Sequence, residues 1–192
     1  LLEYDEYIAD LSGRIKRAEK AMMSAAARLT DERKKQASKL CREISRALED
    51  LSFMEVRFDM VFDELTECTA NGIDDCYFVI STNVGEKMRP LYEVASGGEL
   101  SRIMLAIKSC MASEDNIGTL VFDEIDVGIS GRAAQAVAEK MAVISRSHQV
   151  ISITHLPQIA AMADSHYLIE KSAEGGKTVT HIERLGDEES IL

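Results

Sequence analysis

The chain has 192 residues, which is enough for one globular domain with an appendage or for two small domains. Its hydrophobic fraction of 46% is sufficient for a packed core. The formal net charge of −11 excludes a chain that binds nucleic acid over its whole surface, so any such contact requires a local basic patch or other parts of a larger protein.

The sequence shows no signal peptide and no apolar run long enough to cross a bilayer. None of the four cysteines belongs to a CxxC pair, which predicts reduced thiols in a cytoplasmic protein; they are Cys41, Cys68, Cys76 and Cys110. The first residue is not Met, and both ends stop within a helical pattern, so we expect a fragment of a longer chain.

Residues 1–50 contain no proline and a single glycine, Gly13. From Ile8 to Leu29, apolar residues recur at alternating steps of three and four, which is the heptad seam of a coiled coil. The flanking positions are heavily charged, as on the exposed faces of such a helix. We therefore predict a coiled-coil arm over residues 1–51, whose partner strand this chain does not obviously supply.

The seam is interrupted by a charged residue. Arg33 occupies a seam position, and apolar contacts resume only at Leu40. Because Thr30 or Asp31 is suited to cap a new helix, we expect a joint or a stutter there. The alternative to a coiled coil is a pair of amphipathic helices packed on a globular core.

The pattern changes after the arm, and residues 52–192 are predicted to form one α/β lobe. Residues 54–62 alternate as a half-buried strand, and Asn71-Gly72 marks a turn before a second strand at 76–81. After a loop containing Pro90, helices and strands alternate, which predicts a parallel sheet. The order is helix 96–112, strand 119–124, helix 132–145, strand 149–155, short helix 157–163 and strand 166–171.

The motif "GGKT" at residues 175–178 resembles the end of a phosphate-binding P-loop. A complete P-loop requires a glycine where this chain has Lys171. The segment is also predicted to join two strands, as a hairpin turning at Gly175 and Gly176. The chain therefore carries no P-loop, and we predict half of a nucleotide site.

Two acids follow the apolar strand "TLVF". We expect that strand to be buried on both faces, so Asp123 and Glu124 emerge at its carboxyl end, where open α/β sheets bind ligands. An acid in the first position can hold Mg²⁺ through water, and the second can act as general base toward water. The alternative is a strand that ends in two solvated acids.

The strand "QVISITH" ends in the same way, with Thr154 and His155. A histidine at this sheet edge can bond a terminal phosphate or the attacking water. A lone histidine is more often a capping or partly buried residue. Here the acid pair ends the preceding strand of the same layer, which favours a functional role.

The helix "SGGELSRIMLAIK" opens on Ser96, Gly97 and Gly98. The hydroxyl of Ser96 and the N–H groups of the two glycines and Glu99 can surround an anion, which the partial positive charge of the helix end also favours. The alternative is an ordinary helix capped by Ser96, which accounts for the serine but not for both glycines.

In this order, "SGGE", "LVFDEID" and "ITH" resemble the signature motif, the Walker B end and the switch histidine in the C-terminal lobe of an ABC-type ATPase head. The helical arm is similar to that of the SMC-like branch. The phrases "VASGGELSRIMLAIK", "TLVFDEIDVGISGRAAQAVAEKM" and "ITHLPQIAAMADSHYLIEK" resemble the RecN family of bacterial DNA repair proteins, and the resemblance runs through most of residues 51–185.

The resemblance implies an ATPase that repairs DNA double-strand breaks at the bacterial nucleoid. It implies as partners an N-terminal lobe carrying Walker A, a second head of the same kind and DNA, and no membrane. ATP and Mg²⁺ would be the cofactors, bound between two heads.

The resemblance also assigns roles to individual residues. Asp123 would support Mg²⁺, Glu124 would orient water, and His155 would sense the γ-phosphate. Four residues would contact the γ-phosphate held by the partner head: Ser96, Gly97, Gly98 and Glu99. Asp126 and Gly128 would lie in a D-loop that crosses to that head.

Two other interpretations remain open. One is a different SMC-like repair or chromosome ATPase with the same site. The other is a coiled-coil adaptor whose head does not hydrolyse ATP. Basic residues on the arm offer a DNA contact, although the solvated face of a coiled coil explains them as well; they are Arg14, Lys16, Arg17, Arg33, Lys34, Lys35 and Lys39.

Overall fold

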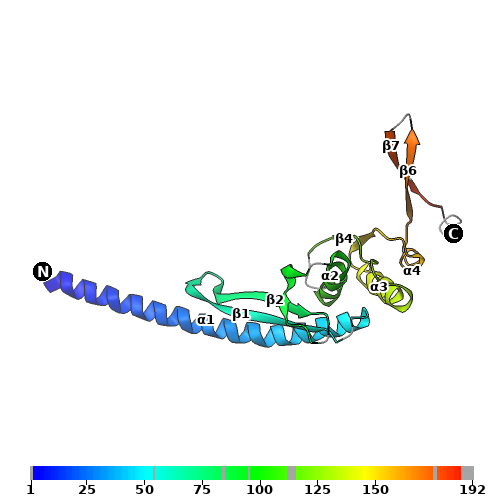
Figure 1. Cartoon of the computed structure of the whole chain (residues 1–192). Coiled ribbons are helices and arrows are strands. Elements are labelled where there is room, and N and C mark those ends of the chain that lie inside the picture. Colours follow the sequence, from blue (N-terminus) through cyan, green and yellow to red (C-terminus); the bar gives the residue numbers. More distant parts are fainter. Residues whose placement is uncertain are drawn as a thin grey trace. The chain divides into compact units, whose positions relative to one another are not determined.

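The computed structural model of the chain, drawn in Figure 1, describes residues 2–53, 55–83, 85–94, 96–111, 116–174 and 177–186. Its contacts define two compact units. The first joins Leu1–Ser45 with Val56–Glu93, and the second joins Arg46–Glu55 with Val94–Leu192. The division at residues 51 and 52 expected from the sequence stays a prediction.

The arm is one helix, α1, which spans Leu2–Asp50 without interruption. The expected joint near Thr30 and Asp31 is therefore wrong, as is the alternative of two separate helices. The hydroxyl of Thr30 donates to the carbonyl oxygen of Ala26, at 3.2 Å, which is the bond a threonine makes inside a helix rather than at its start.

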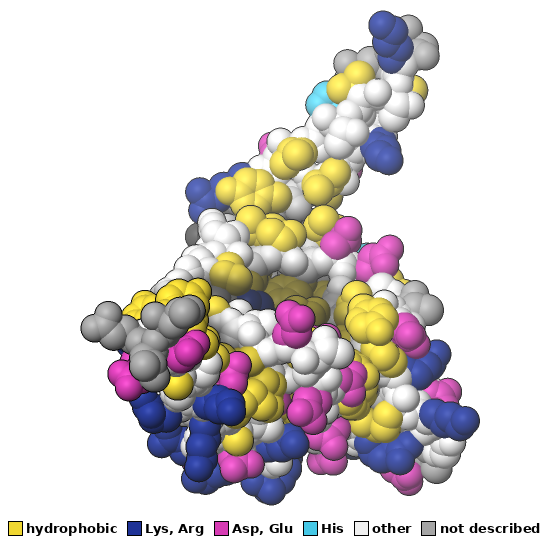
Figure 2. Space-filling view, turned by 90° about the vertical axis from the view of Figure 1, so that its left-hand side faces the viewer, with side chains coloured by type: hydrophobic (Ala, Val, Ile, Leu, Met, Phe, Trp, Pro, Cys, Tyr) yellow, Lys and Arg dark blue, Asp and Glu magenta, His cyan; other side chains and the backbone are white. Residues whose placement is uncertain are grey.

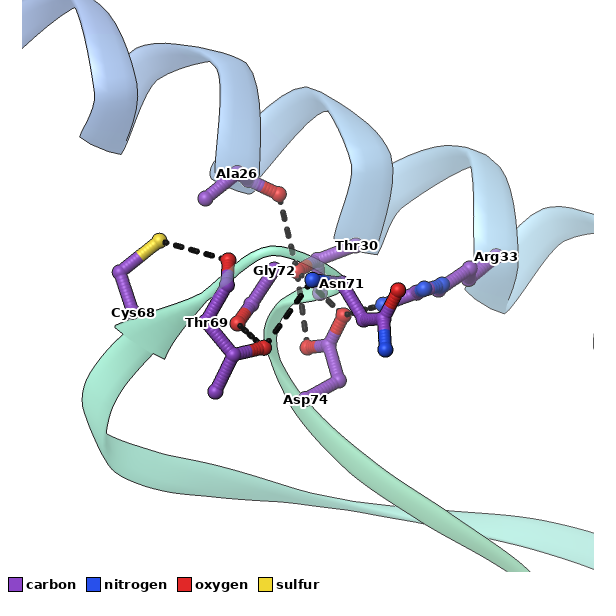
Figure 3. Close-up of polar contacts among 8 residues, drawn as sticks. All are labelled: Ala26, Thr30, Arg33, Cys68, Thr69, Asn71, Gly72 and Asp74. Atoms are coloured by element: carbon purple, nitrogen blue, oxygen red, sulfur yellow. Dashed lines mark hydrogen bonds and ion pairs between the residues drawn. The ribbon is translucent and has the colours of Figure 1, made fainter.

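Arg33, the charged residue in the seam, has a partner 41 positions further along the chain. Its Nη1 lies 3.1 Å from Oδ2 of Asp74, whose side chain is only 6% exposed. The hydroxyl of Thr30 donates to the same carboxylate, at 2.8 and 2.9 Å from its two oxygens (Figure 3). Arginine is a good helix former, so it does not interrupt α1, and the acid of the neighbouring hairpin pairs with its charge.

That hairpin consists of β1 (Arg57–Thr69) and β2 (Gly72–Ser81), paired antiparallel along α1 in Figure 1. Both strands are longer than predicted. Gly72 confirms the expected turn, with a φ of +100° that favours glycine. A short strand, β3 (Arg89–Pro90), adds to β2 before the 3-10 turn η1 (Leu91–Glu93), so Pro90 lies in a strand rather than in the expected loop.

The core of the first unit lies between the second half of α1 and this hairpin. Ala37, Cys41 and Ile44 are buried on the helix, and Phe58 packs against Phe78 with ring centroids 5.0 Å apart. By contrast, the seam residues of the first half are exposed, including Ile8, Leu11, Ile15, Met22 and Leu29. The coiled-coil pairing of that half stays a prediction that needs a second helix.

The second unit contains the predicted α/β alternation. Strands β4 (Thr119–Phe122) and β5 (Gln149–Ser152) pair in parallel, which confirms the parallel sheet. The helices are α2 (Gly97–Met111), α3 (Gly131–Ile144) and the short α4 (Pro157–Ala160). Their buried residues form the core together with β4; they include Ile103, Leu105, Ala106, Ala134, Val137, Ala138, Met141 and Ile159.

The strand before the acid pair is buried on one face only, so the expectation of burial on both faces is wrong. Leu120 and Phe122 are buried, whereas Val121 is 64% exposed. Ile151 and Ile153, on and just after β5, are also about half exposed. Parallel sheets normally have both faces covered, so this pair presents an open apolar face within the described residues.

The second unit ends in a hairpin of β6 (Tyr167–Glu174) and β7 (Lys177–Arg184), as predicted. The expected turn at Gly175 and Gly176 lies outside the described residues. Because Thr178 lies in β7 and not at the start of a helix, "GGKT" has no P-loop context. Figure 2 shows hydrophobic side chains along this hairpin, where the exposed apolar residues are Tyr167, Leu168, Ile169 and Ile182. Among the described helices, none is long and apolar enough to span a membrane.

Candidate nucleotide site

The acid pair follows β4 directly, and both side chains are exposed. Oδ1 of Asp123 accepts the N–H of Glu124 at 2.8 Å, and the carbonyl oxygen of Asp123 accepts the hydroxyl of Ser101 at 2.7 Å. Glu124 has a φ of +56°, a left-handed conformation that costs free energy for a residue with a side chain. Such conformations persist where neighbouring contacts hold them, and they gather at functional sites.

The start of α2 supplies some of those contacts. Ser96 caps the helix, because its carbonyl oxygen accepts the N–H of Leu100 at 2.9 Å and its hydroxyl oxygen accepts that of Glu99 at 3.4 Å. A Cβ on Gly98 would lie 3.0 Å from the carbonyl oxygens of both Glu124 and Val127. A Cβ on Gly97 would collide with the carboxylate of Glu124.

Contacts within this unit therefore explain why both positions are glycine, which the sequence pattern did not reveal. They let the backbone after β4 lie directly against the first turn of α2. The carboxylate of Glu124 occupies the mouth of the helix, where the partial positive charge of the helix end favours an anion. A phosphate can occupy the same place only if the Glu124 side chain moves away.

The next acid, Asp126, joins the two strand ends. Its side chain is buried, and Oδ2 accepts the hydroxyl of Thr154 at 2.5 Å and the N–H of His155 at 2.9 Å. Burial raises the pKa of the Asp126 carboxyl, but these hydrogen bonds and the charge of His155 outweigh it, so the pKa is lowered from its usual value. Asp126 is therefore held as a carboxylate that fixes the loop after β5 to the loop after β4.

The ring of His155 lies beside the same carboxylate, with Nδ1 at 3.2 Å from Oδ2 of Asp126. The side chain is otherwise open, at 72% exposed. Because Nδ1 faces the carboxylate, Nε2 is the nitrogen that can meet a ligand. Asp126 thus sets both the backbone position and the ring orientation of His155.

The structure joins most of the predicted site residues through the segment 123–128. Gly97 and Gly98 contact Glu124, and Asp126 contacts His155. Gly128 is exposed, with a φ of +77° and no atom close to a Cβ built on it. Asp126 points into its own lobe, so the role expected for it toward a partner head stays a prediction.

The sequence analysis missed Arg102, which contacts the same segment from α2. Its Nη1 donates to the carbonyl oxygens of Ile125, at 3.3 Å, and Val127, at 2.9 Å. The signal was available, because a positive charge one turn after Gly98 falls on the otherwise apolar face of the helix.

The residues present suit Mg²⁺ only as a partial site. Asp123 and Glu124 offer carboxylate oxygens, which are the ligands that Mg²⁺ prefers. No group of three or more His, Cys, Asp or Glu side chains in the described part of the chain is arranged to hold a metal ion. A Mg²⁺ ion at this edge would take most of its ligands from water and from phosphate, which fits its usual coordination.

The fold, with its long helical arm, is that of an SMC-type head domain. The chain is similar to the solved Smc head domain with a coiled coil and joint from Pyrococcus yayanosii, with a TM-score of 0.58 and 21% identity. That comparison covers 97% of this chain and 32% of the other. No family model matches the sequence.

Curated relatives specify the family. The DNA repair protein RecN of Halalkalibacterium halodurans is 42% identical over 195 residues, which is 100% of this chain and 34% of the relative. RecN of Bacillus subtilis is 41% identical over 202 residues, which is 97% of this chain and 35% of the relative. The chain belongs to the RecN family, and it spans about a third of the length of these relatives.

Proposed function

We propose that the protein containing this chain is an SMC-like ATPase of DNA double-strand break repair in the bacterial cytoplasm, at the nucleoid. In this proposal residues 1–51 belong to the coiled-coil arm and residues 52–192 to the C-terminal lobe of the head. The observation that carries it is the segment 123–128, through which the start of α2, the acidic end of β4 and His155 are joined.

The first partner in this proposal is an N-terminal lobe that carries Walker A. The open face of β4 and β5 supports it, because Val121, Ile151 and Ile153 present apolar side chains where a parallel sheet is normally covered. Continuation of the sheet into that lobe would cover these side chains and add the P-loop that this chain lacks.

The second partner is another copy of the head, with ATP and Mg²⁺ between the two. Ser96, Gly97, Gly98 and Glu99 would meet the γ-phosphate held by the other head. In the present arrangement the Glu124 carboxylate occupies that place, so closure would require its side chain to turn away from α2. The glycines then serve both states, because they accept either anion at the helix end.

Within its own head, Glu124 would orient the attacking water and take its proton as general base. Bound Mg²⁺ would offset the charge of the phosphates, with Asp123 among the groups that hold it through water. His155 would direct Nε2 toward the γ-phosphate while Asp126 holds Nδ1. Asp126 and Gly128 lie in the loop that would approach the partner head.

Turnover of ATP by the full-length protein, with and without DNA, tests this function. We expect Glu124→Gln to lower kcat by about 100-fold or more, as loss of a general base does, while ATP binding is retained. Glu139→Gln, an exposed change on α3, is the matched control and should leave kcat unchanged. Normal turnover by Glu124→Gln would contradict the role of Glu124, and ATP binding without turnover in the unchanged protein would favour the adaptor.

A further inference from the structure

Arg102 is a charged residue inside the second unit. Its exposed fraction is 8%, and it lies on the buried face of α2 beside Ile103 and Ala106. Burial lowers the pKa of its guanidinium from the usual value, against the opposing effect of Glu99. An arginine is rarely buried without specific partners, because removing its charge from water is costly.

One set of partners is the backbone after β4. Nη1 of Arg102 donates to the carbonyl oxygens of Ile125 and Val127, which flank Asp126 on either side. A hydrogen bond from a charged group to a carbonyl is stronger than one between neutral groups. The two bonds therefore fix the backbone from which the Asp126 carboxylate reaches Thr154 and His155.

The other partner is Phe53, whose ring centroid lies 5.6 Å from Cζ of Arg102, within the range of a cation–π contact. Phe53 is itself held tightly to the end of α1. Its N–H donates to the carbonyl oxygen of Leu48 at 3.2 Å, and the N–H of Ser52, which has a φ of +67°, donates to that of Glu49 at 3.0 Å. These are the two bonds of a Schellman motif.

We propose that Arg102 is a positioning residue that couples the end of α1 to the segment 123–128, which carries Asp126. The contacts run from Phe53 to Arg102, from Arg102 to the backbone around Asp126, and from Asp126 to His155. A change at the end of α1 is thereby transmitted to the residues that face ATP. The inference rests on the proposed ATPase function for its kinetic consequence, but the contacts themselves do not.

The kinetic test uses the full-length protein and three variants. Arg102→Met removes the charge and keeps an apolar stem, Arg102→Lys keeps a charge with fewer donors, and Phe53→Leu removes only the aromatic face. We expect Arg102→Met to lower kcat about tenfold or more with the KM for ATP changed less than about threefold, because the loop is misplaced while the phosphate contacts remain. Arg102→Lys should restore part of the loss, and Phe53→Leu should give a smaller loss than Arg102→Met.

A second measurement separates this inference from the proposed function. Amide hydrogen exchange of the same full-length proteins, without ATP, reports on the loop directly. We expect Arg102→Met to speed exchange in residues 125–128 about tenfold or more and to leave α3 unchanged. Arg132→Met, an exposed change on α3, is the matched control and should alter neither exchange nor kcat.

The outcomes are distinct. Faster loop exchange in a protein that never hydrolyses ATP would support the contacts and overturn the proposed function. Wild-type loop exchange and a wild-type kcat in Phe53→Leu would overturn the coupling to α1, and the same result in Arg102→Met would overturn the positioning role of Arg102. If Arg102→Met does not fold, the comparison of Arg102→Lys with Phe53→Leu decides, and unchanged loop exchange in both would contradict it.

Discussion

Gly97 and Gly98 are neighbours, but an added methyl group would meet different atoms at each. At Gly98 it would press on two backbone carbonyl oxygens at 3.0 Å, those of Glu124 and Val127. At Gly97 it would meet only the end of the Glu124 side chain, which can rotate away. The two residues therefore make different demands on the fold, although the sequence presents them as a pair.

We predict that Gly98→Ala destabilises the protein by about 1–3 kcal/mol, as overpacking against backbone does. Gly97→Ala should cost less than about 1 kcal/mol, because the Glu124 side chain can move and alanine favours a helix. Urea unfolding of the full-length protein measures both changes. An equal cost for the two substitutions would contradict the packing described here.

Asp126 gives a prediction about pH. Its pKa is lowered in the folded state, so its contribution to stability is present above its unfolded value, near 3.8, and is lost as pH falls through the folded value. The stability difference between the wild type and Asp126→Asn should therefore be largest near neutral pH and shrink below about pH 4. Urea unfolding across this range tests it, with the exposed Asp164→Asn as control. A difference that grew toward acid pH would contradict the assignment.

The cysteines give a chemical prediction. All four lie in the described residues and none forms a disulfide. Burial, with a smaller effect of Asp59, raises the pKa of the Cys41 thiol to about 11, whereas Cys76 is exposed on β2. Because the thiolate is the reactive form, iodoacetamide at pH 8 should modify Cys76 about 100-fold faster than Cys41. Peptide mapping over time measures the ratio, and equal rates would mean that Cys41 is not buried in solution.

At the scale of elements, a charged contact joins α1 to the hairpin of β1 and β2. The carboxylate of Asp74 accepts from Thr30 and pairs with Arg33, and its side chain is nearly buried. Loss of one partner leaves the other polar groups partly removed from water without a hydrogen-bond partner, which costs free energy of folding. The contact therefore holds the tip of the hairpin against the helix, as Figure 3 shows.

We predict that Asp74→Asn costs about 1–3 kcal/mol, because Arg33 loses its charged partner in a partly buried place. Asp75→Asn, at the next and exposed position, should cost less than about 0.5 kcal/mol and serves as the control. The free energy of unfolding in urea gives both values. If the two variants were equally stable, Arg33 would not depend on Asp74.

The sequence was sufficient for the elements whose signals are local. The heptad pattern predicted α1, Asn71-Gly72 predicted the turn, and the alternation after residue 96 predicted the parallel pair. It failed where a distant partner decides the outcome. Arg33 suggested a break in the helix because its partner, Asp74, lies 41 residues further along the chain and cannot be recognised from the local pattern. Likewise, the packing role of Gly98 depends on the loop after β4.

The burial of β4 shows a different limit. Its apolar run correctly indicated a strand of a parallel sheet, but Val121 is exposed here because only one face of the pair is packed. The continuous apolar residues of β4 are typical of a strand in a parallel sheet that is covered on both faces. The apolar run therefore matches the strand as we expect it in the longer protein, where further sheet would cover its second face. This chain spans only about a third of the length of its RecN relatives.

At the scale of the whole molecule, open apolar surfaces on α1 and on the pair of β4 and β5 indicate where further parts of the protein pack. The seam in the first half of α1 needs a second helix, and the open face of β4 and β5 needs further sheet. An N-terminal lobe that carries Walker A and the other strand of the arm would cover both. Both surfaces therefore support the proposal that this chain is half of an ATPase head.

The most direct measurement is ATP turnover by this chain alone, by a separately produced N-terminal half, and by their mixture. We predict no turnover by either half, turnover on mixing, and loss of that turnover when the chain carries Glu124→Gln. ATP turnover by this chain alone would contradict the proposal that it is half of an ATPase head, and turnover by a mixture that carries Glu124→Gln would contradict the role of Glu124. Absence of turnover from two folded halves that associate would also contradict the proposal.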